Sequence, residues 1–254
     1  MMKASTKHKD EGSIVTCILG VVCRDGIIII GDKKVKAGQM TYYEDKIISV
    51  EKYENLIVAA AGFLDIREKF IQDVRNLHVL EKKRIIKIDP SRGFVGLTED
   101  IAHRIYEIYG PRYKAEGYDY ESEAFEALVC HKPKSARPFL YTVDAVGTSS
   151  KVNDYKVIGT GAQYGYLFIK PTYSKNAVMD DMAVIATFVI LLIDKYQIDD
   201  SIGPDETGKV QIWKSPNESD PYEVDGPQLK EILEDAQGRL KKFGNFLILG
   251  KTKS

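Results

Sequence analysis

The chain has 254 residues and 44% of them are apolar, so it can form a substantial core as one large domain or as two small ones. Its 36 Lys and Arg residues nearly balance 37 Asp and Glu residues, so the overall charge gives no general attraction to nucleic acid or to an acidic membrane. Three cysteines without a CxxC pair and four scattered histidines predict neither structural disulfides nor a zinc site. No metal or organic cofactor is implied.

The termini and the apolar runs favour a soluble, cytoplasmic protein. The first residues, "MMKASTKHKDEG", are polar and lack the apolar segment and cleavage site of a secretory signal. The longest apolar run, residues 182–193, is too short to span a membrane and predicts a helix that is buried on most sides. The basic stretch "EKKRIIK" has no interleaved aromatics, so it favours a solvated face or a subunit contact over a nucleic-acid site.

The first half of the chain predicts strands followed by two helices. Strands are expected at residues 15–23, 27–35, 46–50 and 55–62. Asp65 with Glu68 predicts a capping box for the first helix, and Thr98 predicts the N-cap of the second. Between them, "KKRIIKIDPSRGFVG" is expected to be a basic loop. Apolar residues recur at helical spacing in both helices, in the second on one face: Ile66, Phe70, Val74, Leu77, Ile101, Ile105 and Ile108.

The second half predicts another group of strands and two more helices. The stretches "EAFEALVCH", "PFLYTVDAVG" and "DYKVIGTG" are expected strands, separated by the turn-rich segments "KPKSAR" and "TSSKVN". The buried helix, the strand "KVQIWK" and a terminal helix starting at Pro227 complete the pattern. Two strand groups with helices on their outer faces, and no linker between them, predict a single layered α+β sandwich.

Four stretches in this order resemble the proteasome subunit family of the N-terminal nucleophile hydrolases. They are "TCILGVVCRDGIIIIGDKKV", "EDKIISVEKYENLIVAAAG", "LYTVDAVG" with "KVIGTG", and "DDSIGPDETGKVQIWK". The resemblance covers about residues 12–214 and implies a four-layer αββα sandwich of two antiparallel sheets flanked by helices. Because the long N-terminal helix of α-type subunits is not evident, the resemblance is to the β type. It implies a prosegment at residues 1–15 and one domain at residues 16–254.

The family's chemistry requires a threonine that becomes the chain terminus after the prosegment is removed. Thr16 sits four residues before Gly20 and nine before Asp25, which is the family's spacing for this nucleophile. The free α-amine, with an ordinary pKa of about 7.7 to 8.0, can then act as the base for the hydroxyl. The alternative is an ordinary strand threonine.

One departure lies next to Thr16. The family has glycine before the cut bond, whereas this chain has the β-branched Val15. Ser13 and Cys17 therefore stay open as other nucleophiles, each out of register with the Asp25-Gly26 turn.

Asp32 and Lys46 match the acid and the lysine of the family's active site. A three-residue hairpin loop at residues 24–26 pairs Thr16 with Lys34 and places Asp32 diagonally from Thr16, about 7 to 8 Å away by Cα. Lys46 is the predicted bridge across this gap: its ammonium group keeps the local field positive and favours the neutral amine. Its alternative is a solvated lysine.

Three further matches complete the implied site. Gly62 matches the glycine whose N–H points at the developing oxyanion, and its alternative is a turn glycine. Thr160 falls where the family has a serine beside the terminal amine. The family's later Asp-x-x-Ser-Gly pattern selects Asp199 by counting back from Gly203, while Asp200 with Ser201 requires a shift of one residue.

The resemblance implies a threonine-type endopeptidase subunit that cuts unfolded polypeptides inside a chamber of stacked rings. The implied partners are polypeptide substrates, other proteasome-type subunits in homo- or hetero-oligomeric rings, and an ATP-dependent unfoldase; neither nucleic acid nor a membrane is expected. Two alternatives stay open. One is a non-catalytic structural subunit of the same particle, and the other is an amidase or peptide ligase that uses the same nucleophile.

Overall fold

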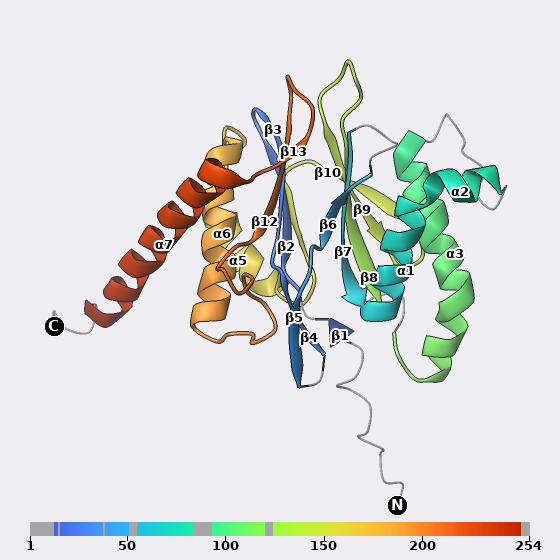
Figure 1. Cartoon of the computed structure of the whole chain (residues 1–254), viewed down its shortest axis with the longest axis horizontal. Coiled ribbons are helices and arrows are strands. Elements are labelled where there is room, and N and C mark those ends of the chain that lie inside the picture. Colours follow the sequence, from blue (N-terminus) through green and yellow to red (C-terminus); the bar gives the residue numbers. More distant parts are fainter. Residues whose placement is uncertain are drawn as a thin grey trace, which may run out of the picture.

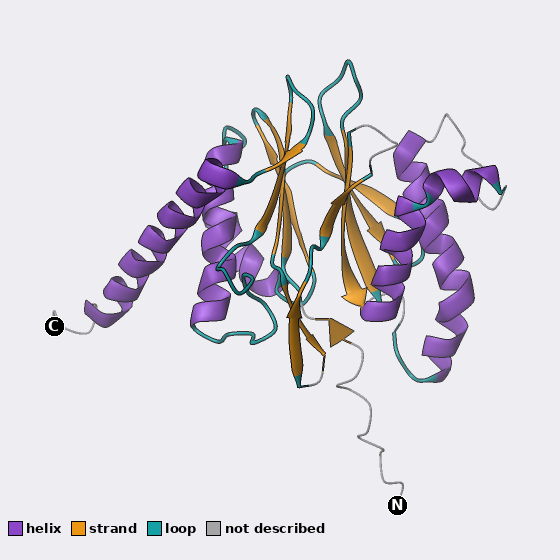
Figure 2. Ribbon diagram, in the orientation of Figure 1, coloured by secondary structure: helices purple, strands orange, loops and turns teal. Residues whose placement is uncertain are grey.

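The computed structural model describes residues 13–14, 16–37, 39–50, 55–83, 93–119 and 124–249. Two antiparallel sheets lie face to face, and helices cover the outer face of each, as Figures 1 and 2 show. The predicted four-layer αββα sandwich is therefore confirmed. In the described part of the chain, no helix is long and apolar enough to cross a membrane.

The first sheet has six strands in the order β1-β7-β8-β9-β10, with β6 also paired to β7. Its strands are β1 (Ser13–Ile14), β6 (Ile47–Ser49), β7 (Leu56–Phe63), β8 (Phe125–His131), β9 (Phe139–Asp144) and β10 (Ser149–Val152). The helices on this side of the sandwich are α1 (Leu64–Arg75), α2 (Leu77–Lys82) and α3 (Gly93–Ala115). As predicted, the apolar stripe of α1 is buried in the core that this sheet shares with its helices.

The second sheet has five strands in the order β11-β2-β3-β12-β13. Its strands are β2 (Ile18–Cys23), β3 (Gly26–Gly31), β11 (Tyr155–Ile158), β12 (Gln211–Pro216) and β13 (Tyr222–Glu223). The helices outside it are α5 (Ala162–Thr172), α6 (Met179–Lys195) and α7 (Gly226–Leu249). A separate hairpin is formed by β4 (Lys34–Ala37) and β5 (Met40–Tyr43).

Strand β3 explains the continuous apolar run "IIII". Ile28 and Ile30 pack in the core beneath α6, whereas Ile27 and Ile29 pack between the two sheets. Both faces of the strand are thus buried, and the alternation of polar and apolar residues typical of a half-exposed strand disappears. Gln211 on β12 ties the sheets together, because its amide group exchanges hydrogen bonds with the backbone of Ile47.

The loop of the first hairpin is shorter than predicted. Cys23 pairs with Gly26, so only Arg24 and Asp25 form the turn. The Asp25 carboxylate accepts a 3.0 Å hydrogen bond from the N–H of Met179, the first residue of α6. A carboxylate is favoured there by the unpaired N–H groups and the dipole of the helix.

Several predicted boundaries were wrong for local reasons. Asp65 lies in the first turn of α1 rather than at its cap, and Thr98 lies inside α3, where its hydroxyl donates to Val95. The expected turn "TSSKVN" instead contains strand β10. This strand pairs with β9 and forms the edge of the first sheet. In the expected basic loop, residues 93–96 are helical and residues 84–92 lie outside the described part of the chain.

Candidate active site

Thr16 lies on an extended segment directly before β2 and is fully buried. Its carbonyl oxygen accepts a 3.0 Å hydrogen bond from the N–H of Gly161. Gly159 packs against the same carbonyl group with a φ of +86°, and a Cβ atom there would lie 2.3 Å from the Thr16 oxygen. The glycine-rich turn after β11 therefore holds the backbone of Thr16 by a close approach that a side chain would prevent.

The hairpin brings Asp32 directly against Thr16. The Thr16 hydroxyl donates a 2.7 Å hydrogen bond to Asp32 Oδ1, and the backbone N–H of Cys17 donates to the same oxygen at 2.8 Å. The backbone N–H of Asp32 in turn donates to the Cys17 carbonyl at 3.2 Å. This reciprocal pair continues the contact between β2 and β3 beyond their last ladder residues and aims the carboxylate at the hydroxyl.

Lys46 contacts the other oxygen of the same carboxylate. Its Nζ donates to Asp32 Oδ2 at 2.8 Å and to the Lys34 carbonyl at 2.7 Å, and the side chains of Lys46 and Asp32 are both 0% exposed. Burial lowers the pKa of Lys46 below its ordinary value, although the Asp32 charge opposes this shift. Lys46 and Asp32 thus form a buried, charge-assisted ion pair in which most of the donors and acceptors are used.

The predicted arrangement of these three residues was wrong in one respect. With a two-residue turn, Ile18 pairs with Gly31, so Thr16 is not paired with Lys34 as a three-residue loop requires. Asp32 contacts Thr16 directly and needs no bridging side chain. The carboxylate, and not the ammonium group, lies in the middle of the three.

Gly62 lies near the end of β7 and is paired with Ile14 of β1. Its φ is +135°, and a Cβ atom would lie 2.2 Å from the carbonyl oxygen of Ala124. Only glycine fits this conformation without displacing β8. Since Ile14 precedes Thr16 by two residues, the strand that carries Gly62 runs beside the chain that leads into Thr16.

Thr160 and Asp199, the two predicted site residues later in the chain, differ in their contacts. Thr160 lies between Gly159 and Gly161, next to the backbone of Thr16, but it is exposed. Asp199 accepts hydrogen bonds from the N–H and the hydroxyl of Ser201 at 3.1 and 3.0 Å. Burial is the main cause that raises the pKa of Cys17, and the charge of Asp199 acts in the same direction.

Ser201 makes its shorter side-chain hydrogen bond to Asp199, and not to the Asp200 with which the shifted pattern paired it. It is buried and bonded to Asp199, while Ile202, at the serine position of the family pattern, packs near Gly161. Asp200 forms an ion pair with Lys36 on the surface, and its contact with the Ser201 hydroxyl is longer, at 3.4 Å. Asp199 and Ser201 thus form a pair, although their spacing is one residue shorter than in the family.

The alternative nucleophiles have different surroundings. Cys17 is fully buried, and burial raises the pKa of its thiol far above the ordinary value, which disfavours the reactive thiolate. Ser13 pairs through its backbone with Phe63. Val15 and residues 1–12 of the expected prosegment lie outside the described part of the chain. Among the described residues, no group of three or more His, Cys, Asp or Glu side chains is placed to hold a metal ion.

A sandwich of two sheets with a hydroxyl, a carboxylate and an ammonium group at the base of its first hairpin defines a proteasome-like architecture. No protein-family model matches the chain. Proteasome subunit beta 1 of Thermococcus sibiricus is 23% identical over 174 residues, which cover 67% of this chain and 75% of that protein. The corresponding protein of Thermococcus gammatolerans is 21% identical over 187 residues, with 71% and 84% covered.

Solved structures of Anbu, an ancestral β-subunit, have the same fold. The protein from Yersinia bercovieri has a TM-score of 0.69 at 14% identity, covering 94% of this chain and 97% of that one. A variant from a Hyphomicrobium species has a TM-score of 0.67 at 12% identity, with 91% and 96% covered. Together these similarities show that the chain has the fold of Anbu and is distantly similar in sequence to proteasome β subunits, which supports a subunit of a proteasome-like particle.

Proposed function

We propose that the chain is a threonine-type endopeptidase subunit in which residues 1–15 are a prosegment and residues 16–254 form the mature domain. The observation that carries this proposal is the buried contact of Thr16 with Asp32 and of Asp32 with Lys46. A strand threonine without a chemical role gives no reason to bury a carboxylate and an ammonium group at considerable cost in solvation.

The first step is hydrolysis of the Val15–Thr16 bond. Water supplies the hydroxyl group of the new carboxyl terminus and the proton of the new amine. In the uncut chain the nitrogen of Thr16 is an amide and cannot act as a base. The free amine takes the proton from the Thr16 hydroxyl, and Lys46, held by Asp32, favours the neutral form of that amine by its positive charge.

The remaining residues have supporting roles in the proposal. The Gly62 N–H stabilises the oxyanion that forms when the hydroxyl attacks a peptide carbonyl. Thr160 and Asp199, with Ser201, interact with the terminal amine. Polypeptides reach the site unfolded inside a cytoplasmic ring-stacked chamber, which leaves a role for an ATP-dependent unfoldase.

Intact mass of the assembled protein tests the proposal. We expect the wild-type chain to lack residues 1–15 and to gain one adduct from an electrophilic peptide inhibitor, whereas Thr16→Ala keeps the prosegment and gains none. Cys17→Ala is the matched control and should still be cut at Thr16 and labelled.

Other masses would replace the proposal with a stated alternative. A wild-type chain that keeps residues 1–15 and takes up no adduct is a structural subunit. A chain that begins at Ser13 or Cys17 moves the nucleophile to that residue. A chain that is cut and labelled, but transfers acyl groups or hydrolyses small amides in place of proteins, is an amidase or peptide ligase.

A further inference from the structure

The backbone of Ile47, the residue after Lys46, is bonded to a side chain where a neighbouring strand would otherwise lie. β6 pairs with β7, and the N–H of Val50 donates to the carbonyl of Leu56. Because hydrogen-bonded and non-bonded pairs alternate along an antiparallel ladder, the N–H and C=O of Ile47 point away from β7. Both meet the amide of Gln211 on β12: the N–H donates to Oε1 at 2.9 Å, and the carbonyl accepts from Nε2 at 2.8 Å.

These two hydrogen bonds are buried, and they fix the orientation of the amide. Gln211 is 3% exposed and Ile47 is 1% exposed. Gln211 Nε2 also contacts Glu223 Oε1 at 3.4 Å, so the nitrogen faces two acceptors and the oxygen faces one donor. A flipped amide would turn its oxygen against both acceptors. Removal of the amide would leave the N–H and C=O of Ile47 unpaired in the protein interior, which is costly.

Gln211 connects the two halves of the ion pair between Lys46 and Asp32. The N–H of Ile47 belongs to the planar peptide group that follows Lys46, so the bonds to Gln211 fix the backbone from which the Lys46 side chain extends. On its own sheet, Gln211 is paired with Gly31, the residue directly before Asp32. One side chain thus binds the residue after Lys46 from a position beside the residue before Asp32.

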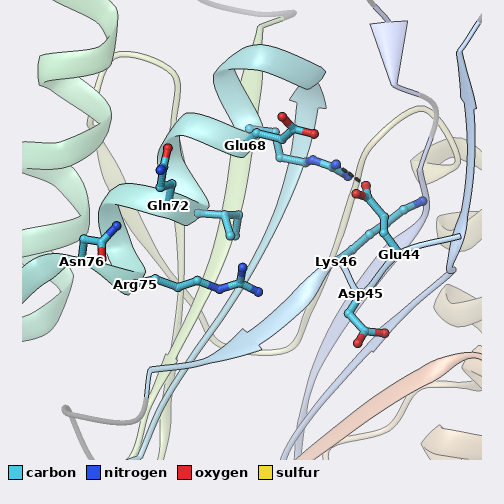
Figure 3. A pocket seen from close by; sticks show the side chains of 9 residues that line it. Glu44, Asp45, Lys46, Glu68, Gln72, Arg75 and Asn76 are labelled. Atoms are coloured by element: carbon cyan, nitrogen blue, oxygen red, sulfur yellow. Dashed lines mark hydrogen bonds and ion pairs between the residues drawn. The ribbon is translucent and has the colours of Figure 1, made fainter.

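The contacts on the other side of Lys46 are more exposed. Glu44 forms an ion pair with Arg67 of α1, marked by the dashed line in Figure 3, and its N–H donates to the Lys33 carbonyl at 2.9 Å. Asp45 pairs with the Lys33 ammonium group at 2.9 Å. The side chains of Glu44 and Asp45 are 27% and 54% exposed, so water weakens both ion pairs. Gln211 therefore supplies a buried anchor where the chain leads from Lys46 into β6.

We propose that Gln211 is a positioning residue: by fixing the peptide between Lys46 and Ile47, it holds the Lys46 ammonium group where its charge acts on the terminal amine of Thr16. The inference rests on the proposed function and adds to it a residue that touches neither the substrate nor the reacting atoms.

The sign of the expected effect follows from the charges near the amine. Asp32, Lys46 and Asp199 are the charged groups that act on the adjacent Cys17, and Lys46 is the positive one among them. A positive charge at a fixed position lowers the pKa of the Thr16 amine and keeps the amine neutral. When Lys46 is displaced, the pKa of the amine rises towards its ordinary value of about 7.7 to 8.0. The acid limb of the pH–rate profile then moves to higher pH.

The pH dependence of peptide hydrolysis tests the proposal on the assembled particle. Gln211→Met keeps the length of the side chain without its amide. We expect its acid limb of kcat/KM to lie at least about 0.5 pH unit above that of wild type, and its kcat at pH 7 to fall at least about tenfold with KM changed less than about twofold. Gln211→Asn, whose amide is one methylene too short to reach both groups of Ile47, should shift the limb in the same direction and gives a second, milder variant.

Ile212→Ala is the matched control, because Ile212 packs in the core on the other face of the same strand. It should lower the melting temperature at least as much as Gln211→Met but leave the acid limb in place. Hydrogen exchange adds a measurement that needs no turnover. The amides of residues 46–48 should exchange at least about tenfold faster in Gln211→Met than in wild type, and Ile212→Ala should not single them out.

The outcomes separate this inference from the proposed function. An active Gln211→Met particle with the acid limb of wild type, the same shift in Ile212→Ala, or unchanged exchange of residues 46–48 overturns the role of Gln211 while the endopeptidase proposal stands. A wild-type particle that neither hydrolyses peptides nor takes up the inhibitor overturns the endopeptidase proposal, and the role of Gln211 in catalysis falls with it.

Discussion

The hydroxyl group of Thr16 donates a 2.7 Å hydrogen bond to the carboxylate of Asp32, and neither residue is exposed to solvent. The two residues are brought together by the tight β2–β3 hairpin. The same carboxylate also accepts from the Cys17 N–H and from Lys46. Asp32 therefore organises the site: it fixes the direction of the hydroxyl and keeps the ammonium group within the protein interior.

Lys46→Ala should lower peptide hydrolysis by at least about a hundredfold, because the amine loses the charge that tunes it. It should also lower the free energy of unfolding by about 3–5 kcal/mol, because the buried Asp32 carboxylate loses its counter-charge. Turnover should be measured per assembled, folded chain. Lys36→Ala removes only a surface pair with Asp200 and should change neither quantity appreciably. Unchanged turnover in a folded Lys46→Ala particle would remove Lys46 from the mechanism.

The layers of the fold could be predicted from the sequence because periodicity reports burial directly. The stripe of Ile66, Phe70 and Val74 and the run of isoleucines in β3 each indicate which faces are covered, and both are buried as expected. The hairpin register could not be predicted in the same way. The turn at Asp25 is held by the N–H of Met179, 154 residues away, and local sequence contains no trace of that contact.

In the candidate site, too, residues that are close in the sequence could be predicted, whereas contacts between distant elements could not. Thr16, Asp32 and Lys46 could be selected by the resemblance to proteasome subunits, since all three lie in the stretch from the start of the first hairpin to the residue before β6. The length of the turn decides which of these three side chains are in contact. The sequence therefore predicted Lys46, and not Asp32, between the other two. Gln211, which anchors the residue after Lys46, and Arg67 depend on contacts between distant elements, and no local pattern marks either of them.

The assembled state gives a second prediction. Proteasome-like subunits pack into closed rings, so we expect a particle on the order of several hundred kilodaltons, alone or with a partner subunit. Light scattering coupled to size exclusion, or native mass spectrometry, measures this on the protein co-expressed with its genomic partners. A species that stays at 28.6 kDa or below under those conditions would contradict the proposed particle.

His131 makes stability depend on pH. It lies at the end of β8 with its ring edge-on to Phe94, and burial lowers its pKa below the ordinary value of about 6.5. The unfolded chain therefore binds this proton more readily than the folded chain does. The stability that neutral His131 contributes is present above about pH 6.5 and is lost as the pH falls through its folded pKa.

Denaturant unfolding at pH 7.5 and 5.5 tests this effect. The wild type should lose stability between the two values, and His131→Gln should lose measurably less because its side chain does not titrate. His103→Gln is the matched control, since His103 is exposed on α3, and it should follow the wild type. An identical loss in His131→Gln would assign the pH dependence to other groups.

Gly62→Ala should be severely destabilising, by about 3 kcal/mol or more, because the new methyl group meets the backbone of Ala124 and Phe125 at a φ that L-residues rarely adopt. Gly238→Ala is the opposite control: this glycine lies inside α7 with nothing within 4 Å of the added Cβ, so alanine should stabilise the chain by about 1 kcal/mol. Thermal and urea unfolding measure both. A Gly62→Ala chain with wild-type stability would show that β8 can move away from β7.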